Sequence, residues 1–361
     1  MSGRLTIVYG GQFGSEGKGQ IVAYIAQRQE IDYAVRVGGP NAGHTFMLPN
    51  GTKQVVQILP APAFVSEAVC VIGAAGLIIP SVLGRELSSA YGYRGGPAEL
   101  VIDAAVGIIT EDHMHRETKL KKSIGSTGEG VGAATADKVM RVPELVVGHD
   151  IAEFFRPLDG FSEWSGVSIK SDTPEWLNKA LLSNDHVLIE GTQGVDLSLH
   201  TSGHYPFCTS RECTPQGMLA QTGISPDNAS TVERIMVVRT YPIRVGGKSG
   251  NLPGEITWEE LKKKTGGYVT EPEITTVTKK QRRIASWDPD QIRRSITVTR
   301  PTCLALTFFD YWYPQLALAT DPSALKKEHW AKINTIEEMT GIPIKYLSTG
   351  FGSVIPLRIT L

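Results

Sequence analysis

Three glycine-rich segments carry side chains of the kinds that bind phosphate and move protons. The first, residues 10–19, contains Ser15 and Lys18 and lies between an apolar stretch at 5–9 and a helix-like pattern at 21–26. A strand, a glycine loop and a helix together aim backbone N–H groups at a phosphate, and a lysine adds positive charge. The spacing departs from the standard G-x-x-x-x-G-K-S/T motif. A phosphate-binding loop is predicted here, with a purely structural turn as the alternative.

The second segment, residues 38–45, contains His44 and directly follows a predicted strand at 33–37. An imidazole can hold or release a proton near neutral pH, which suits a general acid or base. An isolated histidine is more often a structural hydrogen-bonding group, so its place in a glycine turn is what favours catalysis. The third segment, residues 125–132, precedes a predicted helix and Arg141. Its alternative is a flexible loop with a solvated arginine.

Two further clusters combine hydrogen-bonding and cationic side chains. Gln193 stands in a Glu-Gly-Thr-Gln-Gly segment after a predicted strand, and an amide offers the donor and the acceptor that a purine edge needs. Thr209, taken alone, is interpreted as a strand-end hydroxyl. Residues 275–283 place hydroxyls before crowded cations, which suits a loop that closes on a dicarboxylate. A solvated charged face is the alternative for this segment.

Short apolar runs bounded by turn residues predict the strands that position these groups. Besides 5–9 and 33–37, these runs lie at 69–72, 100–102, 187–189, 235–238 and 304–308. Several end in a glycine loop or a polar residue, as in a parallel sheet that holds ligands outside the carboxyl ends of its strands. No linker divides the chain. The prediction is one α/β domain over residues 1–361, with a largely parallel central sheet and ligand-binding loops at the strand C-terminal ends.

Composition argues against several partners. The formal net charge of -1 gives no reason to expect a nucleic-acid polymer or an anionic membrane as partner. The four cysteines form no Cys-x-x-Cys pair, so neither a zinc site nor a disulfide framework is predicted. The uncharged stretch at 68–84 is broken by glycines and Pro80, and is interpreted as a strand, a turn and the start of a helix. The N-terminus lacks the pattern of a signal peptide, so a cytoplasmic protein is expected.

Six motifs, in order from residue 5 to about 350, resemble those of the adenylosuccinate synthetase family: the five segments above and Leu306-Thr307-Phe308-Phe309-Asp310. Gly-Gln-Phe-Gly-Ser-Glu-Gly-Lys-Gly at 11–19 resembles the family's Gly-x-Gln-Trp-Gly-Asp-Glu-Gly-Lys-Gly. Asn-Ala-Gly-His-Thr at 41–45 is the same in both. The resemblance implies a P-loop-related α/β fold and a C–N ligase that uses Mg²⁺, L-aspartate, a purine nucleoside monophosphate and a purine nucleoside triphosphate. It also implies a homodimer.

The resemblance assigns roles to individual residues. Ser15, Lys18 and His44 take catalytic positions, with His44 as the general acid, and Ser15 and the Gly43 carbonyl take magnesium positions. The triphosphate positions are Gly14, Glu16, Gly17, Lys18, Gly19, Gly43, His44, Thr45, Phe308, Asp310, Ser348 and Gly350. The monophosphate positions are Ser15, Asn41, Ser126, Thr127, Gln193, Thr209 and Arg141, of which Arg141 reaches across the dimer interface. The L-aspartate positions are Thr278, Lys280 and Arg282.

Ser15 stands where the family has a catalytic aspartate that accepts the N1 proton of inosine monophosphate (IMP) and also binds magnesium. A serine hydroxyl has a pKa far above neutral and cannot replace a carboxylate as the base. One reading is an ordinary synthetase, acting on IMP with GTP, in which Glu16 is the base. A second is a non-catalytic nucleotide-binding protein. A third is a different purine, because the shorter side chain opens room where the C2 amino group of guanine could meet the hydroxyl.

We predict the third reading. Ser15 and Phe308 resemble a phage branch of the family, which converts dGMP and L-aspartate to N6-succino-2-amino-2′-deoxyadenylate for diaminopurine DNA, with ATP or dATP. A phage-encoded protein of this kind would act in the host cytoplasm. Phe308 replaces the family lysine that covers a guanine, and the residues after Gly350 differ as well, so both positions disfavour GTP as the triphosphate. Asp310 favours GTP, because the family's aspartate at this position recognises guanine. Lys280 replaces an arginine that also contacts the ribose, so recognition of the sugar stays open.

Overall fold

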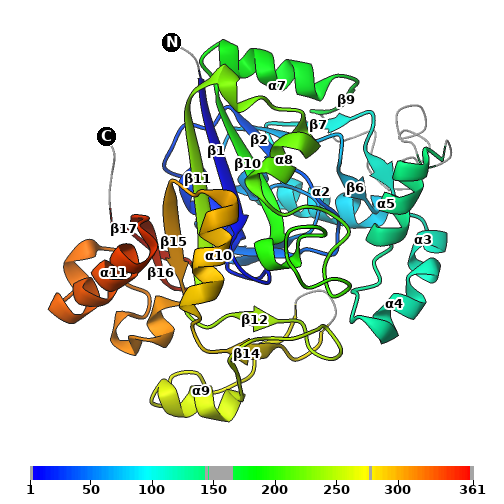
Figure 1. The fold of residues 1–361 in the computed structure, drawn as a ribbon. Coiled ribbons are helices and arrows are strands. Elements are labelled where there is room, and N and C mark those ends of the chain that lie inside the picture. Colours follow the sequence, from blue (N-terminus) through cyan, green and yellow to red (C-terminus); the bar gives the residue numbers. More distant parts are fainter. Residues whose placement is uncertain (1–2, 143–144, 146–165, 276–278, 358–361) are drawn as a thin grey trace.

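Ten strands form one central sheet, with β1 near its middle (Figure 1). The computed structural model of the chain describes residues 3–142, 145, 166–275 and 279–357. The strand order is β17-β16-β15-β11-β1-β10-β2-β5-β7-β9, and all neighbours run parallel except β16 and β17. The strands are β1 (Gly3–Gly10), β2 (Tyr33–Arg36), β5 (Val69–Ile72), β7 (Glu99–Asp103), β9 (Val167–Lys170), β10 (His186–Gly194), β11 (Ala229–Arg239), β15 (Cys303–Thr307), β16 (Ile344–Gly350) and β17 (Ser353–Pro356). The predicted α/β fold with a largely parallel sheet is confirmed.

Each apolar run that predicted a strand forms a strand of this sheet, although the run at 33–37 ends one residue early, at Arg36 of β2. The run at 69–72 coincides with β5. The run at 304–308 forms β15 but ends one residue early, at Thr307. Phe308 leaves the ladder because its backbone is left-handed, with a φ of 57°.

The uncharged stretch at 68–84 contains the predicted strand, turn and helix start, and adds a short strand before the helix. It forms β5, a turn, the short strand β6 (Leu77–Ile78) and the first residues of the helix α2 (Pro80–Arg94). Within the described part of the chain, no helix is long and apolar enough to cross a membrane.

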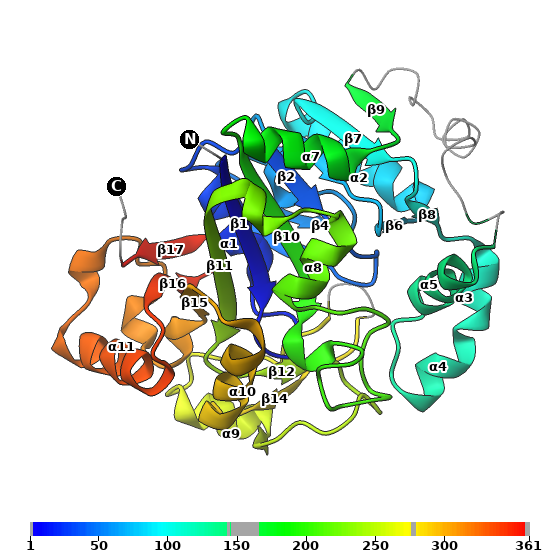
Figure 2. The same cartoon turned by 45° about the horizontal axis from the view of Figure 1, so that its top comes forward.

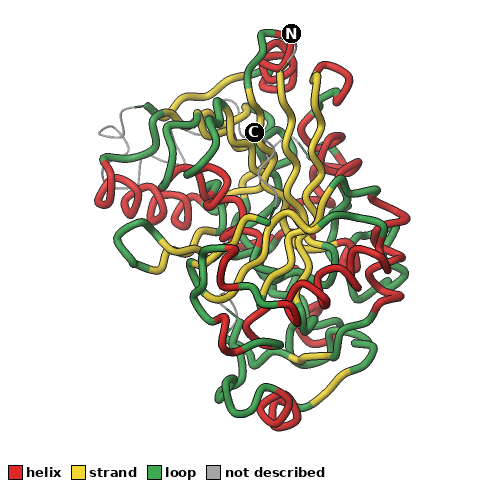
Figure 3. Tube along the Cα trace, turned by 90° about the vertical axis from the view of Figure 1, so that its left-hand side faces the viewer, coloured by secondary structure: helices red, strands yellow, loops and turns green. Residues whose placement is uncertain are grey.

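Alternate side chains of each strand pack against helices on opposite faces of the sheet. Cys70 and Ile72 of β5 belong to the core that includes α1 (Lys18–Ala26) and α2, whereas Val71 belongs to the core on the other face. That face carries the helices α7 (Thr173–Leu182), α8 (Pro215–Thr222), α10 (Pro289–Thr299) and α11 (Lys327–Thr340). Figure 1 shows α8 and α10 in front of the sheet and α2 behind it, and Figures 2 and 3 show the same layers from two other directions. Two cores require strands that are apolar on both faces, which explains their nearly continuous apolar runs.

Local signals set the ends of the covering helices. Asp288 caps α10 because its carboxylate accepts hydrogen bonds from the backbone N–H groups of Asp290, at 2.9 Å, and Gln291, at 3.3 Å. Pro289 occupies the first helical position, where its missing N–H costs nothing. Gly341 ends α11 in a left-handed conformation with a φ of 68°.

Smaller elements surround the carboxyl ends of the central strands. They are β3 (His44–Met47), β4 (Lys53–Val56), β8 (Gly107–Ile108), α3 (Glu111–Arg116), α4 (Thr118–Ser123), α5 (Val131–Met140), β12 (Ile243–Arg244), β13 (Glu255–Ile256), α9 (Trp258–Lys264) and β14 (Arg283–Ala285). Figure 1 shows β12 and β14 beyond the end of β1, and α3, α4 and α5 to one side. Six neighbouring strands, β16, β15, β11, β1, β10 and β2, end toward this region. Their loops carry most of the predicted polar motifs, so the strand order brings these motifs together.

Candidate active site

A cavity of about 1020 Å³ lies where these loops meet. All six sequence motifs contribute to its wall. The predicted site residues that line it are Gly14, Ser15, Gly17, Lys18, Gly19, Asn41, Gly43, His44, Thr45, Ser126, Thr127, Gln193, Thr209, Arg282, Phe308, Asp310, Ser348 and Gly350. Segments that are far apart in the chain therefore form one site.

Three predicted site residues of the described chain do not belong to this wall, and a fourth lies outside the described residues. Glu16 is fully buried and lies outside the cavity lining. Lys280 is exposed and also lies outside it, and Thr278 lies outside the described residues. Arg141 is exposed at the end of α5, away from the lining. Its position is compatible with the predicted action in the site of a second subunit, which stays a prediction.

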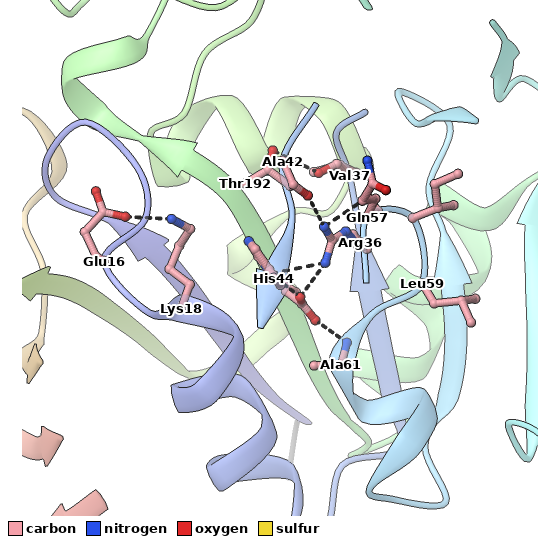
Figure 4. Close-up of polar contacts among 12 residues, drawn as sticks. Glu16, Lys18, Arg36, Val37, Ala42, His44, Gln57, Leu59, Ala61 and Thr192 are labelled. Carbon is pink, nitrogen blue, oxygen red and sulfur yellow. Dashed lines mark hydrogen bonds and ion pairs between the residues drawn. The ribbon is translucent and has the colours of Figure 1, made fainter. Parts of the chain in front are cut away.

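The carboxylate of Glu16 holds the first glycine loop in shape, and Figure 4 shows its ion pair with Lys18. It accepts hydrogen bonds from the backbone N–H groups of Gly14, at 2.8 Å, and Gln12, at 3.2 Å. It also pairs with Nζ of Lys18 at 2.7 Å. A side chain at Gly10 would collide with this carboxylate, so the close approach requires glycine there. Lys18 is thereby held at the cavity wall, whereas the Glu16 carboxylate presents no oxygen to the cavity.

Ser15 lies in the middle of the same loop and faces the cavity with an exposed side chain. Its φ is 61°, a left-handed conformation that aspartate and asparagine adopt more readily than most other residues. Nη1 of Arg239 donates a hydrogen bond to the Ser15 carbonyl oxygen at 3.3 Å, which ties the loop to the end of β11. The loop thus presents a neutral hydroxyl where the related motif has a carboxylate.

His44 begins β3 and belongs to a buried charge cluster, part of which is seen in Figure 4. Its Nδ1 lies 2.5 Å from Oε1 of Glu190, and the same oxygen accepts a hydrogen bond from Nη1 of Arg36 at 2.6 Å. The other Glu190 oxygen accepts a hydrogen bond from the backbone N–H of Ala61 at 2.7 Å. Nε2 of His44 is buried and has no partner among the described residues. It is the ring atom left for a substrate.

Electrostatics decide the charge of this histidine. Burial lowers the pKa of His44 to about 4, and the neighbouring Arg36 acts in the same direction. The ring is neutral at pH 7 in this structure, with its Nδ1–H donating to Glu190 and its Nε2 able to accept. An anionic phosphate beside Nε2 would favour the protonated ring. A bound phosphate therefore supplies the condition under which His44 can act as the predicted general acid.

Arg239, at the end of β11, links the first loop to the far wall of the cavity. Its side chain is fully buried, and its Nη2 lies 2.5 Å from Oε1 of Glu273. Its guanidinium carbon lies 3.7 Å from the centre of the Phe308 ring, within the range of a cation–π interaction. Because the same guanidinium donates to the Ser15 carbonyl, one cation connects the loop, the aromatic wall and Glu273.

The helix α5 begins beside the part of the cavity wall that contains the predicted monophosphate residues Ser126 and Thr127. Glu117 caps it by accepting hydrogen bonds from the backbone N–H groups of Gly130, at 3.1 Å, and Ala133, at 3.2 Å. A carboxylate at a helix N-terminus is electrostatically favourable. These N–H groups already have a partner, so we expect a bound phosphate to rely on side chains of the wall such as Thr127 and Thr209.

Arg282 is the one cation of the predicted L-aspartate set on the described cavity wall. Its Nε is buried and has no partner among the described residues, and burial lowers the pKa of the guanidinium. A guanidinium nitrogen without an acceptor suits a substrate carboxylate, with which arginine forms strong charge-assisted hydrogen bonds.

Sequence reasoning assigned no role to Arg36, Glu190, Arg239 or Glu273. Two of them carried a usable signal, because Arg36 and Arg239 are charged residues at the ends of apolar strands, where parallel sheets hold their ligands. Glu190 stood inside a motif that drew attention only to Gln193. Glu273 lies in an irregular segment, and nothing local indicated its pairing with Arg239.

The wall also fits a magnesium ion that binds through phosphates. Mg²⁺ commonly takes one or two protein oxygens, together with substrate phosphates and waters. Ser15 and Gly43 line the same cavity and supply a hydroxyl and a carbonyl oxygen. Within the described ranges, no three His, Cys, Asp or Glu side chains are grouped as a metal site. Phosphate oxygens would therefore have to supply the negative charge around the ion.

Comparison with known proteins finds relatives that match nearly the whole length of the chain. The adenylosuccinate synthetase family model matches residues 7–157 and 160–315. The adenylosuccinate synthetase of Methanocaldococcus jannaschii is 36% identical over 349 residues, which cover 96% of this chain and 94% of the relative. That of Pyrococcus horikoshii is 35% identical over 348 residues, which cover 95% of each.

Two solved structures have the same fold. One is the succinoaminodeoxyadenylate synthetase of cyanophage S-2L, bound to dGMP and to dATP as an energy donor. It has a TM-score of 0.80 and 25% identity, and the match covers 99% of this chain and 97% of the other. The other is the fully ligated adenylosuccinate synthetase of Plasmodium falciparum, with a TM-score of 0.80 and 19% identity, over 98% of this chain and 99% of the other. The latter likeness supports the fold alone.

Proposed function

This chain belongs to the adenylosuccinate synthetase family, and from that premise we propose that its substrates are dGMP, L-aspartate and ATP or dATP. As a member of this family it is a C–N ligase. The proposed product is N6-succino-2-amino-2′-deoxyadenylate, an intermediate for diaminopurine DNA. The single observation that carries the choice of dGMP is Ser15, a neutral hydroxyl exposed at the cavity wall where the family has an aspartate.

The proposed reaction has two steps. In the first, O6 of guanine attacks the γ-phosphorus, so an O6–P bond forms and the bond from that phosphorus to the bridging oxygen breaks, releasing the nucleoside diphosphate. The N1 proton passes to a base other than Ser15 as O6 is phosphorylated. In the second, the amino group of L-aspartate attacks C6, the C6–O6 bond breaks to release phosphate, and the new C6–N bond is left neutral as the amine gives up a proton.

Residues of the wall have matching parts in these steps. Lys18 and the backbone N–H groups of its loop would bind the triphosphate. Nε2 of His44, which has no partner in the described structure, would meet the oxygen that is phosphorylated. Arg282 would bind a carboxylate of L-aspartate. Mg²⁺, held by oxygens of Ser15 and Gly43, would neutralise charge on the phosphates.

Two properties of Ser15 support guanine over hypoxanthine. Its side chain is shorter than that of aspartate and leaves room beside the N1–C2 edge of the purine. Its hydroxyl can accept a hydrogen bond from the C2 amino group without adding a negative charge. The similar cyanophage enzyme, which is bound to dGMP, supports the same choice.

A second candidate is the reaction of IMP with GTP. It is favoured by Asp310, a carboxylate on the cavity wall, and by the archaeal adenylosuccinate synthetases that resemble the chain. In that reaction, as in the reaction of dGMP, a group other than Ser15 must accept the N1 proton.

The test is a comparison of monophosphates. With L-aspartate, Mg²⁺ and ATP or dATP saturating, the purified protein should release phosphate with dGMP and much more slowly with IMP. Lys18→Ala serves as the inactive control. Equal or faster turnover of IMP, with either ATP or GTP, would establish the second candidate. Absence of turnover with every purine monophosphate would leave a nucleotide-binding protein.

A further inference from the structure

Asp310 lies on the cavity wall beside Phe308, in a short 3-10 turn after β15. It is 3% exposed. Its Oδ2 accepts a hydrogen bond from the hydroxyl of Tyr268 at 2.9 Å. Its Oδ1 is buried and has no partner among the described residues. The carboxylate of Asp310 therefore has one oxygen, Oδ2, that already accepts a hydrogen bond and one, Oδ1, that can accept a hydrogen bond from a ligand.

Tyr268 comes from the segment after α9 and reaches Asp310 across 42 residues of sequence. Its ring packs edge-on against Tyr311, with the ring centres 6.3 Å apart, and both rings line the cavity. Burial and the neighbouring Asp310 raise the pKa of the Tyr268 phenol to about 12. The phenol therefore keeps its proton at pH 7 and is the donor in this hydrogen bond.

Purine bases differ in what they offer to such a carboxylate. Guanine presents two neighbouring donors, N1–H and the C2 amino group, which pair best with both oxygens of one carboxylate. Adenine presents one donor group, the C6 amino group. A single free acceptor matches adenine, and guanine would leave one of its buried donors without a good partner, which is costly. The Phe308 ring can stack on either purine and does not distinguish them.

We propose that Tyr268 determines the specificity for the triphosphate: by holding Oδ2 it leaves Asp310 one free acceptor, which selects 6-aminopurine nucleotides over guanine nucleotides. This inference rests on the proposed function in that the cavity binds a nucleoside triphosphate. It assigns the choice of base to a residue that contacts Asp310 rather than to Asp310 alone.

Equilibrium binding of triphosphates, in Mg²⁺ and without dGMP or L-aspartate, tests the inference. Wild-type protein should bind ATP and dATP about tenfold more tightly than GTP, and about tenfold more tightly than purine riboside triphosphate, which lacks the 6-amino group. Tighter binding of GTP, or equal binding of the analogue without the amino group, would overturn the assignment.

Tyr268→Phe keeps the ring but frees Oδ2. It should lower the ATP-to-GTP affinity ratio by about tenfold, chiefly through tighter binding of GTP. Tyr313→Phe is the matched control, because Tyr313 lies outside the cavity lining and packs on Phe309 and His329. It should leave the ratio unchanged. A Tyr268→Phe protein with the wild-type ratio and an unchanged melting temperature would also overturn the proposal. Because no monophosphate is present, failure of dGMP turnover and failure of this selectivity remain separate results.

Discussion

At the scale of single residues, Ser15 affects the chemistry of the first glycine loop more than its backbone conformation. Its left-handed conformation is one that aspartate adopts more readily than serine. The loop, held by Glu16 and by Arg239, could therefore carry an aspartate without rearrangement. What the serine changes is the charge and the space that the cavity offers to a purine.

Ser15→Asp should move the preference from dGMP toward IMP, because a carboxylate fills the room beside C2 and can accept the N1 proton. The ratio of kcat/KM for IMP to that for dGMP should rise about tenfold or more, as expected for a hydrogen bond to a charged group. Phosphate release with each monophosphate measures it. Ser15→Ala, the control, should lose activity on dGMP without gaining activity on IMP. An unchanged ratio in the aspartate variant would contradict this role.

Glu190 is the shared partner of two buried side chains, Arg36 and His44. Glu190→Gln keeps the shape but leaves Arg36 without a counter-charge, so the free energy of unfolding should fall by about 3–5 kcal/mol. Glu255→Gln breaks the more exposed pair with Arg283 and should cost about 1 kcal/mol or less. Urea denaturation of both variants makes the comparison. If both variants lose a similar free energy of unfolding, burial does not determine how much the pair of Glu190 with Arg36 contributes to stability.

At the scale of elements, the helix of the phosphate loop packs closely on the strand that carries the histidine. Gly19 in α1 faces His44 in β3, and a Cβ added at Gly19 would lie 2.8 Å from the Cβ of His44. Non-bonded carbon atoms do not approach so closely. The glycine therefore sets the distance between α1 and β3, and with it the position of the imidazole relative to the phosphate loop.

Gly19→Ala should displace His44 and lower kcat by about tenfold to a hundredfold, since small misplacements of catalytic groups are costly. Gly92→Ala is the matched control. Gly92 lies in α2, where an added Cβ meets nothing within 4 Å. That variant should gain about 0.5–1 kcal/mol in the free energy of unfolding and keep its activity. Steady-state kinetics and denaturation measure kcat and the free energy of unfolding of both variants. Equal activities would show that the contact between Gly19 and His44 is not important for catalysis.

At the scale of the whole molecule, the site is built from six neighbouring strand ends, yet Arg141 lies outside it. Arg141 follows α5 directly, and the last two residues of that helix, Val139 and Met140, are 70% and 73% exposed. Exposed apolar side chains beside a cation suit a contact between subunits. We therefore propose that a homodimer forms and that Arg141 completes the monophosphate site of the neighbouring subunit.

Arg141→Leu should raise the KM for the monophosphate while the protein stays folded, because a phosphate contact is lost. Mixing it with Lys18→Ala should restore activity, since hybrid dimers then contain one intact site. Random exchange of subunits in an equal mixture makes about half of the dimers hybrids, each with one intact site of two, so about a quarter of the wild-type activity should be recovered. Light scattering and activity of the separate and mixed variants provide the measurement. A fully active monomer, or no recovery after proven exchange, would exclude action across subunits.

Much of the fold could be predicted from the sequence because strands and glycine loops leave local patterns. Residues 69–72 are apolar, mostly β-branched and bounded by turns, and they form β5 as predicted. The segment at 10–19 carried its own loop and helix signals. The carboxyl ends of parallel strands meet at one edge, so it also followed that Ser15, His44 and Asp310 would share a cavity.

The sequence by itself thus determined which segments are strands, which loops bear polar groups, and that a serine stands in place of a catalytic aspartate. Only the tertiary structure decided which of those groups face the substrate and which are used to hold others. Glu16 and Ser15 are neighbours in sequence, yet one is buried in an ion pair with Lys18 and the other is exposed to the cavity. Arg239 with Glu273, and Asp310 with Tyr268, are pairs formed across distant segments. Local patterns do not encode such pairs, because a side chain finds its partner only after sheet order and loop packing have placed the two segments together.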